Sequence, residues 1–182
     1  MALLKGAVLL VVALFAASGV ASARPVYSSR EQALARVLPP PATIERKTYF
    51  LTDAEREKAS RLAKARIDSS LVVVYVGREP KGLLGTAYFD THTVRTMPET
   101  ILVTVKPDGS VGGVEVLAFG EPEDYLPRPR WLGLFGGKRL DANLAVGRGL
   151  AHVTGATLTT RAIAEAVRRV LAIHRVISEA AP

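Results

Sequence analysis

The 182-residue sequence carries 24 lysines and arginines against 17 aspartates and glutamates, which gives a formal net charge of +7, and it contains no cysteine. A chain without cysteine forms no disulfide, no thiolate metal site and no thioether link to a haem or a flavin. Its basic residues are dispersed, and no basic stripe is interleaved with aromatic residues, which argues against nucleic acid as a partner. The excess charge favours solubility and attraction to an anionic membrane surface or an acidic partner.

The first 23 residues have the three parts of a secretory signal peptide. Lys5 gives a basic start, an apolar run follows over residues 7–17, and Ala21-Ser22-Ala23 forms an A-x-A end. The apolar run is shorter than the ~20 residues that a membrane-spanning helix needs. We therefore expect export and cleavage after residue 23, and the alternative is that the segment is retained as an N-terminal anchor.

The rest of the chain is long enough for one domain. A short helix is predicted over residues 28–38, and the three prolines at 39–41 end it. We interpret residues 24–43 as a tether between the export signal and the folded body. Residues 44–182 then form the domain.

The first half of the domain alternates strand and helix signals. A strand is predicted over 44–51, and the TDAE sequence of Thr52–Glu55 is a capping box that opens a helix running to about Ile67. β-branched runs then predict strands over 70–77 and 83–96. None of these segments carries a chemical motif, so we expect them to pack the core.

The second half begins with the clearest local signal in the chain. Two apolar runs within residues 99–119 flank the turn sequence Pro107–Ser110, which predicts an antiparallel hairpin. Residues 120–149 are rich in proline, glycine and arginine, a composition more typical of a functional lid or wall than of a linker. Within them, Trp131, Leu132 and Phe135 predict one helical turn.

An amphipathic helix is predicted from about Thr160 to Ser178, close to the end of the chain. Its apolar residues share one face, which we expect to lie on the core. The pattern of elements therefore predicts an α+β fold, a single domain in which an antiparallel sheet packs with helices.

Conventional catalytic motifs are scarce. The three histidines, at 92, 152 and 174, have no metal-ligand spacing, and no HExxH, GxSxG, P-loop or GxGxxG motif occurs. Glu121, Glu123 and Asp124 form a cluster of carboxylates, for which a solvated loop is the default interpretation. We predict neither a catalytic residue nor a metal site.

The run Thr154–Thr157, TGAT, lies directly before the last helix. The N–H groups at the start of a helix are unpaired and the helix dipole is positive there, so this position favours a phosphate. Gly155 and Ala156 allow a ligand close to the backbone, and the hydroxyl that ends the run can be esterified. Thr159 and Thr160 compete for the N-cap position. A plain helix cap is the alternative.

The stretch TGATLTTRAIAEAV resembles the flavinylation motif of the FMN-binding domain found in the C subunit of the sodium-pumping NADH:quinone reductase and the G subunit of the Rnf complex. In that family the last threonine of [ST]GAT, which is Thr157 here, carries FMN through a phosphoester. A separate flavin transferase installs it outside the cytoplasmic membrane.

A second segment carries the same resemblance. The family often has a glutamate-containing loop followed by W-x-x-x-F-x-G-K, and this chain has Glu121-Pro122 and then Trp131, Phe135, Gly137 and Lys138. Two features depart from the pattern. Ala151 stands where the family commonly has an acidic residue. The loop lacks the family's hydroxyl residue between the glutamate and the proline, and Glu123 replaces its glycine.

The resemblance implies an exported flavoprotein with covalent FMN that transfers electrons in a periplasmic or membrane-associated redox chain, rather than a stand-alone enzyme. Its final helix follows the flavin-attachment motif. The implied partners are a flavin transferase for maturation and a redox donor and acceptor among the subunits of a membrane redox complex. The implied cofactor contacts are Thr157, which carries the FMN, with Thr154, Gly155, Ala156, Thr159, Thr160 and Glu121, and with Trp131 and Phe135 as walls of the ring.

Two other functions are compatible with the same residues. One is a non-redox exported module that holds a phosphorylated ligand non-covalently at the helix N-terminus. The other is an exported scaffold without a ligand, in which the threonines only cap the helix.

The A-x-A end predicts that the mature chain begins at Arg24 on the outer side of the cytoplasmic membrane. N-terminal sequencing of the native protein should find this residue first. A native protein that still began at Met1 or Ala2 would instead indicate a retained anchor.

Overall fold

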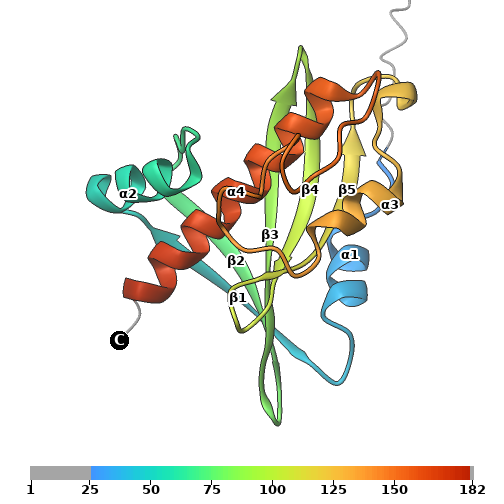
Figure 1. The fold of residues 1–182 in the computed structure, drawn as a ribbon. Helices are drawn as coiled ribbons and strands as arrows, with labels where there is room; N and C mark the ends of the chain where they lie inside the picture. The colour runs from blue at the N-terminus through green and yellow to red at the C-terminus, as the bar shows by residue number, and fades with distance from the viewer. Residues whose placement is uncertain (1–25, 181–182) are drawn as a thin grey trace, which may run out of the picture.

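The computed structural model describes residues 26–180 (Figure 1), so the predicted signal peptide lies outside the described residues. Five strands form one antiparallel sheet in the order β1-β2-β3-β4-β5. The strands are β1 Thr43–Phe50, β2 Leu71–Glu79, β3 Gly82–Val94, β4 Met97–Val105 and β5 Val111–Phe119. The helices are α1 Arg30–Val37, α2 Asp53–Ala63, α3 Pro129–Leu132 and α4 Thr157–Ala180, with 3-10 turns η1 Glu123–Tyr125 and η2 Gly133–Phe135. The predicted α+β fold is confirmed.

The predicted hairpin is formed by β4 and β5, with Val103 opposite Val114. Asp108 stabilises its turn, because one carboxylate oxygen accepts hydrogen bonds from the backbone N–H and the hydroxyl of Ser110 at 2.9 and 2.7 Å. Gly109 has a φ of 77°, which glycine adopts without strain. The turn residues thus place the two strands as the sequence predicts.

The main core lies between one face of the sheet and the long helix α4, which crosses the strands diagonally (Figure 1). Ile163, Val167 and Val170 of α4 are fully or almost fully buried there, and α2 packs beside α4. Within residues 26–180, no helix is both long and apolar enough to span a bilayer. The apolar stripe of α4 is buried in the core.

The segment before β1 packs on the opposite face of the sheet. Leu34 and Leu38 are 8% and 2% exposed and contact a second apolar cluster that includes Leu102 and Leu117. The backbone N–H of Tyr27 also donates to the carbonyl of Leu117 at 2.8 Å. The interpretation of residues 24–43 as a tether is therefore wrong for the described residues 26–43, because α1 covers apolar side chains that the sheet would otherwise expose.

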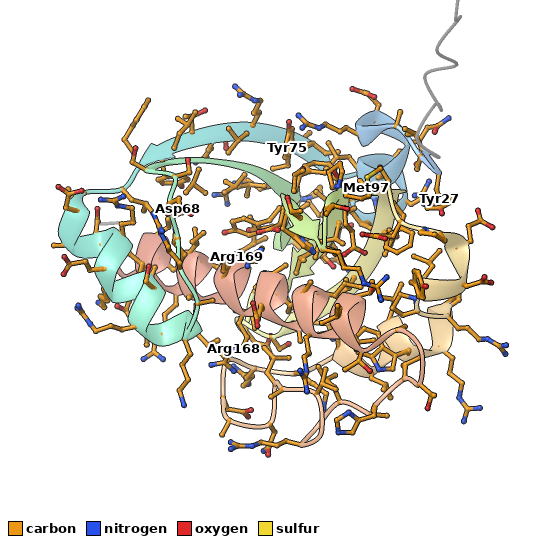
Figure 2. The ribbon with its side chains drawn as sticks, turned by 90° about the horizontal axis from the view of Figure 1, so that it is seen from above. Tyr27, Asp68, Tyr75, Met97, Arg168 and Arg169 are labelled. Carbon is orange, nitrogen blue, oxygen red and sulfur yellow. The ribbon has the colours of Figure 1, made fainter. Side chains whose placement is uncertain are left out.

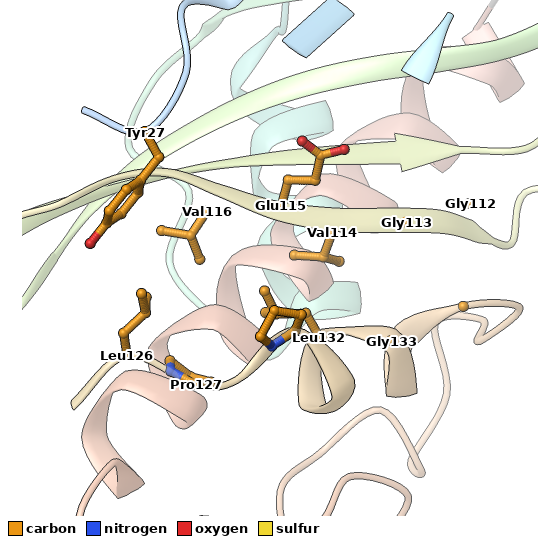
Figure 3. A pocket seen from close by; sticks show the side chains of 12 residues that line it. Tyr27, Gly112, Gly113, Val114, Glu115, Val116, Leu126, Pro127, Leu132 and Gly133 are labelled. Carbon is orange, nitrogen blue, oxygen red and sulfur yellow. The ribbon is translucent and has the colours of Figure 1, made fainter. Parts of the chain in front are cut away.

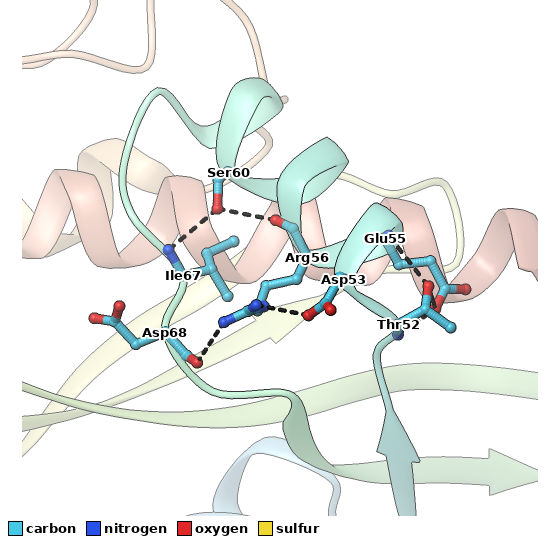
Figure 4. A network of polar contacts seen from close by, with 7 residues as sticks. All are labelled: Thr52, Asp53, Glu55, Arg56, Ser60, Ile67 and Asp68. Carbon is cyan, nitrogen blue, oxygen red and sulfur yellow. Dashed lines mark hydrogen bonds and ion pairs between the residues drawn. The ribbon is translucent and has the colours of Figure 1, made fainter.

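The capping box that opens α2 is confirmed (Figure 4). The Thr52 hydroxyl accepts from the N–H of Glu55 at 3.3 Å, and the Glu55 carboxylate accepts from the N–H of Thr52 at 2.8 Å. The helix ends at Ala63, earlier than the predicted Ile67. Lys64 takes a left-handed φ of 55°, and the N–H of Ile67 donates to the Ser60 hydroxyl at 3.2 Å instead of continuing the helix.

Arg168 joins α4 to two other segments. Its guanidinium donates to the carbonyls of Ala63 and Leu62, which end α2, at 2.7 and 3.3 Å. It also donates to the carbonyls of Asp141 and Leu144 in the loop before α4, at 2.7 and 3.3 Å. The last carbonyls of a helix have no partner within the helix, so Arg168 satisfies groups that would otherwise need water.

The loss of Arg168 should destabilise the fold. Arg168→Met keeps most of the aliphatic stem and removes all four hydrogen bonds, so the free energy of unfolding should fall by about 2–4 kcal/mol. The exposed Arg161 on the same helix is the control. Arg161→Met should change the free energy of unfolding by less than ~0.5 kcal/mol. Chemical denaturation of the two variants measures both values, and equal midpoints would contradict the role of Arg168.

Candidate functional site

A tight turn places the TGAT run at the start of α4. The N–H of Ala156 donates to the carbonyl of Val153 at 3.2 Å, and Gly155 has a φ of 83°. A turn with this geometry at its third position favours glycine. Thr154 and Gly155 are exposed, and no atom lies within 4 Å of the position that a Cβ on Gly155 would take. The turn therefore leaves open space beside the backbone.

The helix begins at Thr157, three residues before the predicted start. The first helical hydrogen bond runs from the N–H of Thr160 to the carbonyl of Ala156 at 2.9 Å. In the described part of the chain, the N–H groups of Thr157, Leu158 and Thr159 have no acceptor. Three donors and the positive end of a 24-residue helix thus converge at one point, as an anion site requires.

The predicted N-cap role of Thr159 and Thr160 is wrong. Both lie inside the first turn and are only 2% and 0% exposed. The Thr160 hydroxyl donates back to the carbonyls of Ala156 and Thr157 at 3.0 and 3.1 Å, which satisfies a buried hydroxyl within the helix. Burial closes both side chains to a ligand, and of the predicted contacts here only the Thr159 N–H stays available.

A cavity of about 590 Å³ adjoins the TGAT turn; we call it the TGAT cavity. This volume falls within the usual size range of cofactor sites. It is lined by Asp124, Leu126, Arg128, Arg130, Trp131, Leu134, Ala151, Val153, Thr154 and Ala156. The proline-rich segment from η1 to η2 therefore forms a wall opposite the turn, which agrees with its sequence-based interpretation.

Trp131 holds the wall to the turn. Its indole N–H donates to the carbonyl of Ala151 at 2.8 Å, and its ring meets Phe135 edge to face with centroids 5.3 Å apart. Trp131 is 6% exposed and still lines the cavity. Phe135 is completely buried and does not line it, so its prediction as a ring wall is corrected: Phe135 belongs to the core.

Glu121 lies in the loop before η1 and is not among the residues that line the cavity. Its side chain is 8% exposed, and one carboxylate oxygen is 3.7 Å from the Arg95 guanidinium. The other oxygen, Oε1, is buried and has no hydrogen-bond partner within residues 26–180. Arg95 also stacks over the Tyr125 ring at 4.1 Å. The loop thus holds one buried acceptor without a hydrogen-bond partner.

Comparison with known families finds a match to this region. Residues 97–172, from the start of β4 to the middle of α4, match the family model of the FMN-binding domain. Over these residues the chain is similar to that family. FMN is the cofactor that this likeness supports, and the protein is a flavoprotein. The match includes the hairpin, the wall and the TGAT turn.

The solved structures give the same fold. The crystal structure of NqrC from Shewanella oneidensis is similar with a TM-score of 0.53 and 20% sequence identity, over 75% of this chain and 85% of that chain. No curated protein matches the chain in sequence. The likeness to NqrC covers a larger share of the chain than residues 97–172 do.

The residues around the TGAT turn fit FMN. Unpaired N–H groups at the start of α4 suit a phosphate, and the adjacent cavity is large enough for a flavin ring. The unpartnered oxygen of Glu121 is buried outside this cavity and adds no contact to it. Of the predicted contacts, the structure gathers Trp131, Thr154 and Ala156 around one cavity.

Two other hollows contain none of the predicted contacts. One, of about 510 Å³, lies between β5 and the segment from Leu126 to Gly136, with Tyr27 at one end (Figure 3). The other, of about 450 Å³, lies between α4 and β3, with His92 in its wall. Neither contains a residue of the TGAT run, so we do not assign FMN to them.

The sequence analysis missed a buried polar cluster at this second hollow. His92 bonds to Asp90 and Glu99 with its two ring nitrogens, at 2.8 and 3.0 Å, and Arg169 pairs with Asp90 at 2.9 Å. Figure 2 shows Arg169 on the sheet side of α4, with Arg168 on the other side. Asp90 and His92 are two apart on one strand, a spacing that could have placed both on one face. Their cross-strand partner Glu99 has no such signal.

The cluster shifts the protonation of its members. Burial by itself lowers the pKa of His92, but hydrogen bonds to Asp90 and Glu99 outweigh burial and raise the pKa to about 8. Burial raises the pKa of Glu99. Burial also acts upward on Asp90, but hydrogen bonds from His92 and Arg169 hold its pKa below the usual value. The histidine is therefore charged at neutral pH and bridges two carboxylates.

Stability should depend on pH through His92. Its pKa is raised from 6.5 to about 8, so its contribution is fully present below pH 6.5 and is lost as pH rises past 8, a fall of about 2 kcal/mol in the free energy of unfolding. Burial lowers the pKa of His174, so this group changes the free energy of unfolding only below pH 6.5, where it destabilises the fold as pH falls. Denaturation from pH 6 to 9 should show this fall in the wild type and a flat profile in His92→Gln. A fall of equal size in the variant would assign it to another group.

Proposed function

We propose that the chain is an exported flavoprotein that carries FMN on Thr157 and transfers electrons in a periplasmic or membrane-associated redox chain. One observation supports the attachment most directly. Thr157 is the first residue of α4, its side chain is partly exposed, and its neighbours Thr154 and Ala156 line the TGAT cavity. A hydroxyl, unpaired N–H groups and a ring-sized cavity therefore occur at one place.

Burial and bonding favour Thr157 over the other threonines. Thr159 and Thr160 are buried, and the Thr160 hydroxyl is used within the helix. Thr154 is exposed but lies within the turn, before the helical N–H groups. The Thr157 hydroxyl has no hydrogen-bond partner in the described structure, and it stands at the positive end of α4.

The attachment would join Thr157 Oγ1 to the phosphorus of the flavin, with loss of the hydroxyl proton. An activated donor such as flavin adenine dinucleotide balances this step, because its nucleoside monophosphate leaves as the new ester forms. The phosphodiester keeps one negative charge. The free N–H groups of Thr157, Leu158 and Thr159 would stabilise that charge through the start of the helix.

The rest of the site would hold the ring and exclude water. FMN supplies one- or two-electron transfer chemistry when it is bound, and the protein positions it and tunes its electronics. Trp131, Leu126 and Leu134 give the cavity apolar surface, and the bond from Trp131 to the Ala151 carbonyl fixes the wall.

The location and the partners rest on the N-terminal sequence and on the family. A signal peptide would carry the chain to the periplasm or to the outer face of the cytoplasmic membrane. A flavin transferase would act there. The likeness in fold to NqrC, together with the flavinylation motif, supports redox partners among the subunits of a membrane complex. The donor and the acceptor would exchange electrons with the flavin at the exposed TGAT side.

A non-redox module that binds a phosphorylated ligand reversibly is the second candidate. The unpaired N–H groups at the start of α4 favour it equally, because they bind any phosphate. The two functions differ in a simple observation. Covalent FMN gives a yellow protein that keeps its colour after acid precipitation, whereas a reversible ligand is removed by dialysis.

Thr157→Val should abolish covalent FMN. The substitution replaces the hydroxyl by a methyl group of similar size, so helix packing is retained while the ester oxygen is lost. Thr154→Val makes the same change at the first threonine of the TGAT run and should keep the cofactor. Intact mass after co-expression with a flavin transferase should show an FMN adduct in the wild type and Thr154→Val, and none in Thr157→Val.

Ala151→Asp tests the departure from the family pattern in the same assay. An adduct that forms in Ala151→Asp but not in the wild type would show that the transferase requires the acidic residue. An adduct in Thr157→Val that is lost in Thr154→Val would move the attachment to the first threonine of the run. A wild type and Ala151→Asp that both lack any adduct would reject covalent FMN.

A further inference from the structure

Few contacts hold the first half of the cavity wall, residues 121–130, to the rest of the molecule. In the described structure, all of its backbone hydrogen bonds are to residues 121–132. The second half of the wall is fixed by the bond from Trp131 to the Ala151 carbonyl and by the burial of Phe135. The first half therefore depends on its side chains to keep its place.

Arg95 contacts this first half from the turn between β3 and β4. Its guanidinium lies over the Tyr125 ring, 4.1 Å from the centroid, and 3.7 Å from a carboxylate oxygen of Glu121. Within residues 26–180, no other hydrogen bond, ion pair or cation–π contact joins a side chain of residues 121–130 to the rest of the chain. We call Arg95, Glu121 and Tyr125 the Arg95 clamp.

The clamp neutralises a buried charge. The Glu121 side chain is largely buried, and in the described structure Arg95 is its only ion-pair partner. A buried carboxylate that loses its cation is strongly destabilised, and it recovers hydration by moving toward water. Without Arg95, the Glu121 carboxylate would move outward and take the loop before η1 with it.

The backbone at Arg95 agrees with this role. Arg95 has a φ of 52°, in the left-handed region that a β-carbon makes unfavourable and that glycine adopts freely. Within residues 26–180, the only other non-glycine residue with a positive φ is Lys64, at the end of α2. A glycine would form the β3–β4 turn with less strain, so the turn alone does not account for an arginine. The contacts of its side chain offset the strain.

We propose that Arg95 is a positioning residue for the flavin. Asp124 and Leu126, the sequence neighbours of Tyr125, both line the TGAT cavity, whereas Arg95 does not. By holding Tyr125 and Glu121, Arg95 keeps this part of the wall against the ring without touching the ring itself. The inference rests on the proposed function, since it takes the ring to lie in the TGAT cavity.

Amide hydrogen exchange tests the clamp in the protein expressed without a transferase. The probes are the N–H groups of Tyr125 and Leu126, which bond to carbonyls three residues earlier at 3.0 and 2.9 Å. Arg95→Gly removes the clamp and relieves the turn. Both amides should then exchange about ten-fold faster, because opening of the wall no longer breaks the stacking and the ion pair. The N–H of Gly137, bonded to the Val111 carbonyl, should keep its wild-type rate.

Three further variants separate the clamp from general effects. Lys64→Gly also replaces a left-handed residue and removes one positive charge, but the exposed Lys64 side chain makes no hydrogen bond or ion pair with residues 26–180, so exchange should not change. Tyr125→Leu removes the stacked ring and should reproduce the fast exchange, whereas Tyr125→Phe keeps the ring and the slow exchange. Wild-type exchange in Arg95→Gly and Tyr125→Leu, or fast exchange in Lys64→Gly or Tyr125→Phe, would overturn the clamp.

The flavin reports the positioning role once FMN is attached. Arg95→Gly and Tyr125→Leu leave Thr157 in place, so the covalent adduct should persist. The visible circular dichroism of the ring should weaken in both, because a loose wall no longer gives the ring fixed asymmetric surroundings. Lys64→Gly and Tyr125→Phe should keep the wild-type signal.

The outcomes distinguish the clamp from the flavin assignment. An unchanged flavin signal in Arg95→Gly and Tyr125→Leu would overturn the positioning role, even with faster amide exchange. Loss of the adduct in Arg95→Gly would also overturn it, because Arg95 would then act on attachment rather than on the place of the ring. A wild type without flavin would reject the proposed function while the exchange result stood.

Discussion

The guanidinium of Arg168 fixes the helix on which the site depends. The apolar stripe of α4 holds the helix on the sheet, but apolar contact is not directional and permits sliding and rotation. The four hydrogen bonds of Arg168, to the end of α2 and to the loop before α4, do have directions. They set the position of α4 along its axis. Thr157 lies about three turns earlier on the same rigid helix, so its place beside the wall follows from contacts far from it.

Arg168 and Arg169 show how one helix serves two surroundings. Neighbouring residues on an α-helix point about 100° apart, and here the first arginine binds backbone carbonyls while the second pairs with Asp90 under the helix. The Asp90–Arg169 pair lets β3 carry charged residues on a face that is otherwise apolar. His92 and Glu99 complete the neutralisation, with two positive and two negative groups in a nearly closed volume. The core under α4 thus combines apolar packing with one polar cluster.

Local signals in the sequence were sufficient where the interacting residues are close in the chain. The capping box at Thr52, the hairpin turn at Asp108 and the helical turn at Trp131 involve neighbours only, and all three were predicted. The bonds of Arg168 to α2 and of His92 to Glu99 join segments that only the tertiary fold brings together. The burial of α1 was missed for a related reason, because two leucines give a weak pattern until the sheet face opposite them is known. Threonine is a typical N-cap residue, but Thr159 and Thr160 lie inside the first turn of α4, where neighbouring side chains bury them.

The site itself shows why a departure in sequence need not change the architecture. The family commonly has an acidic side chain at the position of Ala151, and here the contact that positions Trp131 is made by the backbone carbonyl of that residue. Any residue supplies a carbonyl, so the wall of the cavity is independent of the side chain at this position. Ala151 is exposed, and a side chain there would face whatever approaches the turn from solvent. The alanine would therefore alter the surface that the proposed transferase meets, while the turn, the free helical N–H groups and the Trp131 wall remain in place for the proposed flavin.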